Sequence, residues 1–243
     1  SHLTNLWKNS GKRSLSLIFW NQSERQSKPI SLKERSEHMQ HFNAKELNTK
    51  QMYKFLTGSI IPRPIAWITT QNPETQVVNA APFSFFSVAS NVLPLISVAI
   101  LRNDGKIKDS ARNLLASRQG VVHIVSEDLV EEMNRTAAQL PDTESEIDLT
   151  ELTLTASHTV TVPAIKEAKI RMETTVHQYV PLTDADGKVL TDLFILRVED
   201  FLFDETVFDH EKQYVWADKL APVARLAGND YTKLGEIFSL ERP

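Results

Sequence analysis

An arginine flanked by two prolines is the first residue that indicates chemistry. Arg63 stands between Pro62 and Pro64 in the stretch SIIPRPIAWITT, residues 59–70. Because proline fixes the backbone φ angle, the guanidinium is expected to project from a stiff segment. Such a segment loses little entropy when it holds an anion, and a guanidinium offers phosphate two parallel donors. The chemistry predicted for Arg63 is therefore phosphate binding, with an ordinary surface salt bridge as the alternative.

A second anion-binding signal lies where a helix is expected to begin. Lys108, Asp109 and Ser110 open the segment 108–117, whose pattern predicts a helix. Unpaired main-chain N–H groups, the positive end of the helix dipole and a lysine together favour a bound anion. Asp109 has a simpler interpretation as the N-cap of that helix.

Two further segments combine groups that suit a flat, polar ring. Residues 79–86 read NAAPFSFF, and their small side chains allow a ring to approach the backbone. The phenylalanines of this segment are otherwise expected in the core. Residues 223–231 place Arg225 and Tyr231 on either side of a glycine turn, for which the simpler interpretation is a loop with a surface arginine.

Several other kinds of chemistry lack the residues they need. The chain has no cysteine, which excludes disulfide scaffolds, iron–sulfur clusters and thiol nucleophiles. Its seven glycines are too widely spaced for the phosphate-binding loops GxGxxG and GxxxxGKS/T. The histidines of the globular part have no metal-ligand spacing, and there is no GxSxG motif. His123, in an apolar strand, is interpreted more readily as a core residue than as a catalytic one.

Composition and charge limit the partners. The chain has 243 residues, of which 41% are hydrophobic and 24% charged, values typical of a globular protein. No apolar run approaches the roughly 20 residues of a membrane helix, and a net charge of −4 argues against nucleic-acid binding. No export signal is recognised. We therefore expect a cytoplasmic protein with neither a membrane nor a nucleic-acid partner.

The first 38 residues differ from the rest of the chain. They hold seven Lys/Arg and three Asp/Glu, a charge of +4, whereas the remainder holds 20 basic and 28 acidic residues, a charge of −8. One interpretation is a natural extension, and the other is a vector-derived or wrongly assigned upstream segment with Met39 as the true start. In either case residues 1–38 are expected to lie outside a single folded domain formed by residues 39–243.

The hydrophobic pattern predicts the elements that must position these groups. Strands are expected at residues 59–70, 77–90 with an interruption at Pro82, 95–101, 120–126, 170–180 and 193–203. Helices are expected at 43–56, 108–117 and 127–140, a loop with a helical turn at 142–155, and a short terminal element at 234–240. Asn48 or Thr49 is able to cap a turn of the first helix. The turn signal at 184–187 joins the two long strands as a hairpin. Closely spaced strands with inserted helices favour an antiparallel barrel or sandwich over a parallel sheet.

Taken in order, five segments resemble the flavin reductase-like family, whose members fold as FMN-binding split barrels. The segments are SIIPRPIAWITT (59–70), NAAPFSFFSVAS (79–90), KDSARNLL (108–115), VSEDLVEEMNRTA (125–137) and PVARLAGNDYTKLGE (222–236). The branch that they resemble contains flavoredoxin and the reductase components of two-component monooxygenases. The resemblance implies a mainly β fold with inserted helices, an antiparallel, Greek-key-like split β-barrel. It also implies a homodimer with each FMN near the dimer interface.

The resemblance implies roles in FMN binding for particular residues. Those expected at the phosphate or ribityl chain are Arg63, Lys108, Ser84, Asp109 and Ser110. Those expected along the isoalloxazine ring are Asn79, Ala80, Ala81, Pro82 and Trp67. Those expected to reach the site from the partner subunit or to close its mouth are Asn134, Arg225 and Tyr231. Ala227 departs from the family pattern, which often has the first of two glycines there. The double proline common in the family is replaced by residues 92–94, Val-Leu-Pro.

The reaction implied by the resemblance is hydride transfer from NADH or NADPH to N5 of FMN. The cofactor carries this chemistry while the protein binds and orients it, so no catalytic side chain and no metal are expected. The electrons would pass to a monooxygenase or another acceptor. Two alternatives remain open: a non-catalytic FMN-binding electron carrier without a pyridine-nucleotide site, and a barrel that binds haem or another small ligand. The sequence does not choose between NADH and NADPH, because it lacks a glycine fingerprint with a ribose-reading acid.

Overall fold

The structure, a computed structural model, describes residues 39–243, so the prediction made for residues 1–38 lies outside it. The chain divides into two compact units, residues 1–47 and 48–243. The described part of the first unit contains one turn of 3-10 helix, η3 (Ala44–Glu46), whose N-cap Asn43 accepts a hydrogen bond from the Lys45 N–H. The elements described below belong to the second unit.

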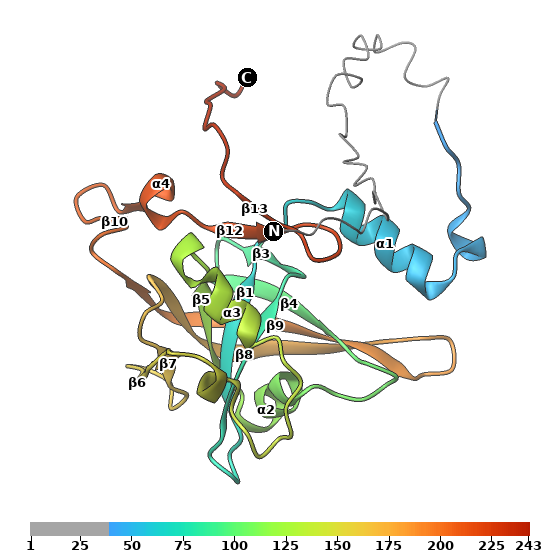
Figure 1. Cartoon of the computed structure of the whole chain (residues 1–243), viewed down its shortest axis with the longest axis horizontal. Helices are drawn as coiled ribbons and strands as arrows, with labels where there is room; N and C mark the ends of the chain where they lie inside the picture. Colours follow the sequence, from blue (N-terminus) through green and yellow to red (C-terminus); the bar gives the residue numbers. More distant parts are fainter. Residues whose placement is uncertain (1–38) are drawn as a thin grey trace, which may run out of the picture. The chain divides into compact units, whose positions relative to one another are not determined.

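A seven-stranded sheet forms the centre of the second unit (Figure 1). In chain order its strands are β1 (Ala66–Gln71), β2 (Val78–Phe83), β3 (Phe86–Ser90), β4 (Leu95–Leu101), β5 (Gln119–Ile124), β8 (Ile170–Thr183) and β9 (Val189–Phe203). In space they follow the order β2-β1-β5-β8-β9-β4-β3, and every neighbouring pair is antiparallel. The prediction of a mainly β, antiparallel fold with inserted helices is therefore confirmed.

The strand order explains why this sheet closes into a barrel. β2 and β3 are its two edges, yet only Ser84 and Phe85 separate them in the chain. Three Cα steps span at most about 11 Å, whereas the edges of a flat seven-stranded sheet would lie about 29 Å apart at the usual strand spacing. The sheet must therefore curve until β2 and β3 meet. These two strands are not paired with each other, so the barrel is split along a seam at residues 84–85.

The position of Pro82 differs from the prediction. β2 continues through Pro82, which lies opposite Trp67 of β1, and ends at Phe83. Because β2 is an edge strand, Pro82 can occupy it without removing a hydrogen bond that a further strand would need. The interruption predicted at Pro82 falls instead at Ser84 and Phe85. The preceding strand is also shorter than predicted, since β1 begins at Ala66.

The α-helices are α1 (Thr49–Ser59), α2 (Asp109–Ser117), α3 (Val130–Arg135) and α4 (Ala217–Leu220), and the remaining 3-10 helices are η4 (Glu127–Leu129) and η5 (Glu146–Leu149). The single helix predicted over 43–56 is wrong, because extended backbone at Leu47 separates η3 from α1. Asn48 caps α1 in a reciprocal capping box with Gln51. The helix predicted over 127–140 ends at Arg135, whereas α2 begins and ends within one residue of its prediction.

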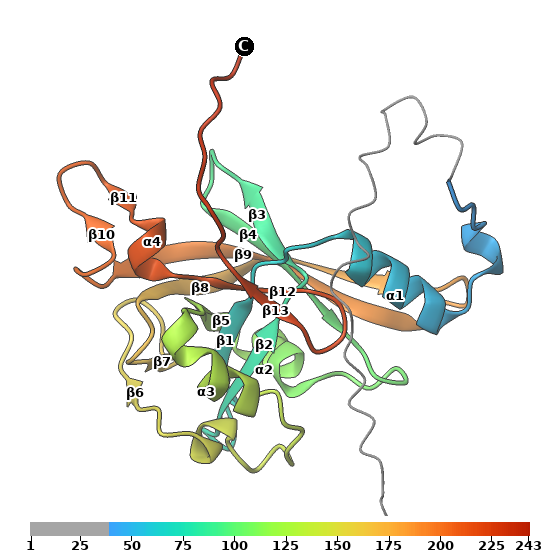
Figure 2. The same cartoon turned by 45° about the horizontal axis from the view of Figure 1, so that its top comes forward.

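Three small two-stranded sheets complete the fold. They pair β6 (Leu154–Thr155) with β7 (Ala164–Ile165), β10 (Phe208–Asp209) with β11 (Tyr214–Val215), and β12 (Val223–Arg225) with β13 (Tyr231–Lys233). Residues 234–240, predicted as a terminal element, have no regular structure. The hairpin predicted for the two long strands is confirmed: β8 and β9, drawn in orange in Figure 2, turn at 184–187, where Gly187 has a φ of +81°.

Two large apolar clusters hold the strands and helices together. One fills the barrel and includes the fully buried Val98, Phe194 and Leu196, and the α2 residue Leu114. The other contains Trp67 and Met133 and lies on the outer side of β1 and β2, beneath α3. None of the described helices is long and apolar enough to cross a membrane.

Candidate functional site

Two adjoining cavities lie where β2 ends. The larger, of approximately 680 Å³, reaches the seam residues Ser84 and Phe85, and we call it the seam cavity. The smaller, of approximately 430 Å³, reaches the first turn of α2, and we call it the helix cavity. The residues that line both are Pro82, Phe83, Lys108 and Ala137. Both volumes fall in the range of small-molecule sites, and the two cavities adjoin at these four residues.

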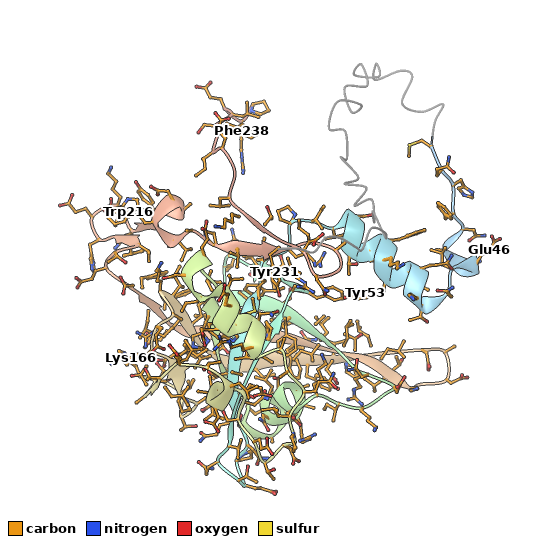
Figure 3. The ribbon with its side chains drawn as sticks, in the orientation of Figure 1. Glu46, Tyr53, Lys166, Trp216, Tyr231 and Phe238 are labelled. Atoms are coloured by element: carbon orange, nitrogen blue, oxygen red, sulfur yellow. The ribbon has the colours of Figure 1, made fainter. Side chains whose placement is uncertain are left out.

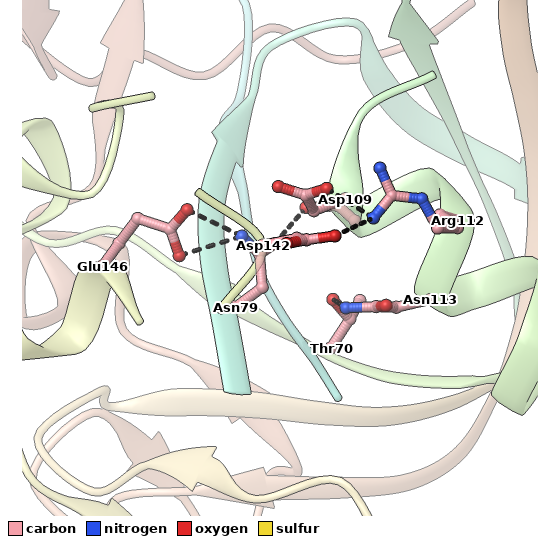
Figure 4. A network of polar contacts seen from close by, with 8 residues as sticks. Thr70, Asn79, Asp109, Arg112, Asn113, Asp142 and Glu146 are labelled. Carbon is pink, nitrogen blue, oxygen red and sulfur yellow. Dashed lines mark hydrogen bonds and ion pairs between the residues drawn. The ribbon is translucent and has the colours of Figure 1, made fainter. Parts of the chain in front are cut away.

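The helix cavity ends at an exposed helix N-terminus. Lys108 is the N-cap residue of α2 and its side chain makes no capping hydrogen bond. Since a lysine has no acceptor to offer, the first-turn N–H groups of α2 have no side-chain cap and remain able to bind an anion. Asp109 is not the N-cap, as one interpretation had it, but the first helical residue. Its carboxylate pairs with Arg112 at 2.8 Å (Figure 4).

Lys108 itself is an unpaired cation at the wall shared by the two cavities. No ion pair of Lys108 is found within residues 39–243, and its ammonium lies 5.8 Å from the centroid of the Phe83 ring. The side chain reaches solvent but is surrounded by enough protein that desolvation lowers the pKa of Lys108. A bound anion would compensate for this loss of hydration.

A buried carboxylate positions the two segments that form the helix cavity (Figure 4). Glu146 of η5 accepts hydrogen bonds from the Asn79 side-chain amide at 2.7 and 2.9 Å and from the Ala80 N–H at 3.0 Å. Asn79 in turn accepts from the Ser110 hydroxyl at 2.6 Å. Burial raises the pKa of Glu146, and the hydrogen bonds that it accepts oppose this change. The chain of bonds ties η5, β2 and the first turn of α2 together.

This network defines what the predicted ring-binding residues of β2 can do. The side chain of Asn79 is fully engaged by Glu146 and Ser110, and Ala80 is fully buried. Ala81 and Pro82 line the helix cavity, and Pro82 also lines the seam cavity. A ring placed along β2 would therefore meet Ala81, Pro82 and the main chain rather than the Asn79 amide.

The seam cavity is aromatic and positively charged. Its lining includes Tyr53 of α1, Phe83, Phe85 and Tyr231 of β13, and among its 15 lining residues are two cations and no carboxylate. Figure 3 labels Tyr53 and Tyr231 on their separate elements. Walls of this kind suit a flat ring that carries negative charge.

The three residues whose approach to the site was left open all line the seam cavity within one chain. The Tyr231 hydroxyl donates to the Asn134 side-chain oxygen at 3.2 Å, and the Arg225 guanidinium lies 4.6 Å from the centroid of the Tyr231 ring. Ala227 stands where the family pattern often has a glycine, but the turn in this chain does not require a glycine at that position. Only the following residue, Gly228, has a positive φ in this turn.

Arg63 lies outside the lining of both cavities. Its guanidinium donates to the main-chain oxygens of Thr57 and Ile60 at 2.7 Å and of Leu226 at 3.0 Å, while its buried Nε has no partner among the described residues. Burial lowers the pKa of Arg63. In this structure Arg63 fastens the end of α1 to the β12–β13 turn, and its role as a phosphate ligand stays a prediction.

Trp67 and His123 support the site from the core. Trp67 is fully buried, and its indole N–H donates to the Thr136 hydroxyl at 2.9 Å behind the wall of the helix cavity. His123 is also fully buried, and both ring nitrogens are hydrogen-bonded, to the Trp67 oxygen at 2.8 Å and to the Ile165 N–H at 2.9 Å. The interpretation of His123 as a core residue therefore holds. Within residues 39–243 no three His, Asp or Glu side chains form a metal-binding group.

The fold and the hollow at its seam define a class of protein, the split-barrel domains. A putative flavin reductase with a split barrel domain from Shewanella frigidimarina has the same fold, with a TM-score of 0.71 and 18% identity over 84% of this chain and 100% of its own. A sequence profile described as "Flavin reductase like domain" matches residues 57–221. The chain therefore belongs to the flavin reductase-like family.

Two closer relatives cover the same part of the chain. Protein YwrF of Bacillus subtilis is 46% identical over 202 residues, which is 83% of this chain and 98% of YwrF. The crystal structure of nitrilotriacetate monooxygenase component B from Bacillus cereus superimposes with a TM-score of 0.80 and 44% identity over 83% of this chain and 98% of that one.

Sequence reasoning missed two residues of this site. Tyr53 lies in the segment 43–56, for which the sequence predicts a helix but no role in the site, and Glu146 lies in the predicted loop 142–155. Glu146 is 67 residues from Asn79 in the chain and lies outside the five recognised segments. Its exclusion from solvent, at 5% exposure, is the property that distinguishes it from neighbouring acids, and the sequence carries no local signal of that.

Proposed function

We propose that this protein is a flavin reductase that binds FMN and transfers hydride to it from NADH or NADPH. The observation that carries the proposal is the pair of adjoining cavities at the seam. One reaches an uncapped helix N-terminus and an unpaired lysine, and the other is aromatic and has no carboxylate in its lining. This arrangement suits a ligand with a phosphate at one end and a flat ring at the other.

The residues present fit FMN. The first turn of α2 and Lys108 would hold the phosphate, with Ser110 fixed in place by Asn79. Pro82 and Phe83, which line both cavities, would lie along the ring. When bound, FMN supplies the hydride-accepting ring.

The side chains around the ring contribute binding, exclusion of water and charge. Phe83, Phe85 and Tyr231 present apolar surface in the seam cavity, which lowers the local dielectric and strengthens electrostatic interactions. Lys108, which lines both cavities, would also favour negative charge that develops on the ring. Side-chain proton transfer is not needed for this reaction.

The proposal extends to an acceptor and to assembly. Because the relative from Bacillus cereus is named as a monooxygenase component, a separate monooxygenase is the proposed acceptor of the electrons.

A homodimer is proposed because the helix α1 has an exposed apolar surface. Thr57 is the buried residue of α1, whereas Met52 is 40% and Leu56 54% exposed. Exposed apolar surface of this kind marks interaction sites. Light scattering should give twice the chain mass for the wild type and a lower mass for Leu56→Asp. The proposed compartment is the cytoplasm.

The test is an anaerobic absorbance spectrum of the protein with FMN, before and after NADH and then NADPH. A perturbed flavin spectrum that bleaches with either donor supports the proposal and identifies the donor. A bound flavin that stays oxidised with both donors would favour a non-catalytic electron carrier. An unperturbed flavin spectrum would refute FMN binding altogether.

A further inference from the structure

We infer that Arg225 binds the diphosphate of the pyridine-nucleotide donor, in the part of the seam cavity that the helix cavity does not share. The inference rests on the proposed function and adds a second anion site to it. The first site, at α2 and Lys108, serves the flavin phosphate. The second would give the nicotinamide donor an attachment point of its own.

The side chain of Arg225 is held in place but retains free donors. Its Nη2 donates to the Gly228 oxygen at 2.6 Å, and its guanidinium carbon lies 4.6 Å from the centroid of the Tyr231 ring. Tyr231 is itself held by Asn134. Within residues 39–243, Nε and Nη1 of Arg225 have no hydrogen-bond partner and the guanidinium has no ion pair. A restrained arginine with free N–H groups at Nε and Nη1 is suited to donate to phosphate oxygens.

The charges around Arg225 favour an anion. Arg225 and Arg63 are paired through their main chains at 2.8 and 3.0 Å, and the charge of Arg225 contributes to the lowered pKa of Arg63. No carboxylate lines the seam cavity. The charges of Arg63 and Arg225 repel each other, and a bound diphosphate would relieve that repulsion.

The placement of Arg225 favours the donor over the flavin. Lys108 lines both cavities, whereas Arg225 lines only the seam cavity. Pro82 and Phe83 line both cavities, so they border the space beside Lys108 and the space beside Arg225. A flavin held at Lys108 and a donor held at Arg225 would both reach these two residues, where their rings would meet.

The test measures binding without turnover. Flavin-loaded protein is titrated with NAD⁺ and with NADP⁺ in a calorimeter, and the apoprotein is titrated with FMN by flavin fluorescence. The variant is Arg225→Gln, which removes the positive charge and keeps a polar side chain of the same length up to Cδ. The matched control is Lys219→Gln, because Lys219 also lies over an aromatic ring, at 3.5 Å from the centroid of Trp216, and lines neither cavity. Figure 3 shows Trp216 well away from Tyr231.

We expect Arg225→Gln to raise the dissociation constants of both NAD⁺ and NADP⁺ about tenfold or more. The same variant should leave the dissociation constant of FMN within about twofold. Lys219→Gln should change none of these three constants. An equal loss of FMN affinity would assign Arg225 to the flavin instead. A loss confined to NADP⁺ would assign it to the 2′-phosphate, and no loss would remove it from the site; each of these results overturns the inference.

The two proposals fail differently. If the wild-type protein binds FMN but neither binds oxidised donors nor is bleached by reduced ones, the proposed function fails and this inference with it. If the wild type is bleached normally and Arg225→Gln binds donors as the wild type does, only this inference fails.

Discussion

Acidification is expected to destabilise the barrel through one buried histidine. His123 lies between the Trp67 carbonyl oxygen and the Ile165 N–H, at 2.8 and 2.9 Å. A carbonyl only accepts and an N–H only donates, so both bonds are satisfied by the neutral ring with its proton on Nδ1. Burial lowers the pKa of His123 from 6.5 to about 4. At 1.36 kcal/mol per pH unit, this interval corresponds to about 3 kcal/mol.

Acidification lowers the free energy of unfolding because the unfolded state binds the proton at a higher pH than the folded state does. The unfolded chain takes up the proton near pH 6.5, and the folded chain only near pH 4. The contribution of His123 to the free energy of unfolding is therefore complete above pH 6.5, declines as the pH falls from 6.5 to about 4, and stays constant below that.

The assay is urea unfolding of the wild type and of His123→Gln between pH 7 and 4. The glutamine carbonyl can accept from the Ile165 N–H but does not titrate, so carboxylate effects are common to both proteins. Over this interval the wild type should lose about 2–3 kcal/mol more than the variant. Parallel curves would refute the reasoning, as would an NMR titration in which the folded His123 ring protonates near pH 6.5.

Three substitutions test the other parts of the site and its support. Lys108→Ala should weaken FMN binding about tenfold by fluorescence, with the exposed Lys212→Ala as control; equal affinities would remove Lys108 from the phosphate site. Glu146→Ala leaves the Asn79 amide without its buried acceptor and should cost about 2–4 kcal/mol in urea unfolding; a loss below 1 kcal/mol would show that water replaces the carboxylate. Gly120→Ala would place a Cβ 3.0 Å from a core side-chain carbon and should cost about 1–2 kcal/mol in thermal unfolding; an unchanged melting temperature would show that the core yields freely.

Some elements were predictable because their signals are local. The β8–β9 hairpin combines two long strand patterns with a turn whose glycine takes a positive φ. The helix α2 follows from a short periodic pattern, and Asn48, one of the two residues expected to cap a turn within the predicted helix 43–56, caps α1. In each case neighbouring residues determine the conformation.

Other elements were mispredicted where the position of a strand in the sheet decides the outcome. Pro82 was expected to interrupt its strand, but the effect of a proline depends on whether a further strand needs its missing N–H. β2 is an edge strand, which is a property of the whole sheet order. The same sheet order closes the barrel at Ser84 and Phe85.

The sequence by itself determined an antiparallel β fold, a helix that begins beside Lys108 and a family whose domain profile matches residues 57–221. Tertiary structure decided how those residues are used. It turned the Arg63 guanidinium onto main-chain oxygens, brought Glu146 to Asn79 across 67 residues, and placed Arg225 and Tyr231 in the seam cavity. Burial and long-range hydrogen bonding arise when distant segments meet, so they leave no local pattern in the chain.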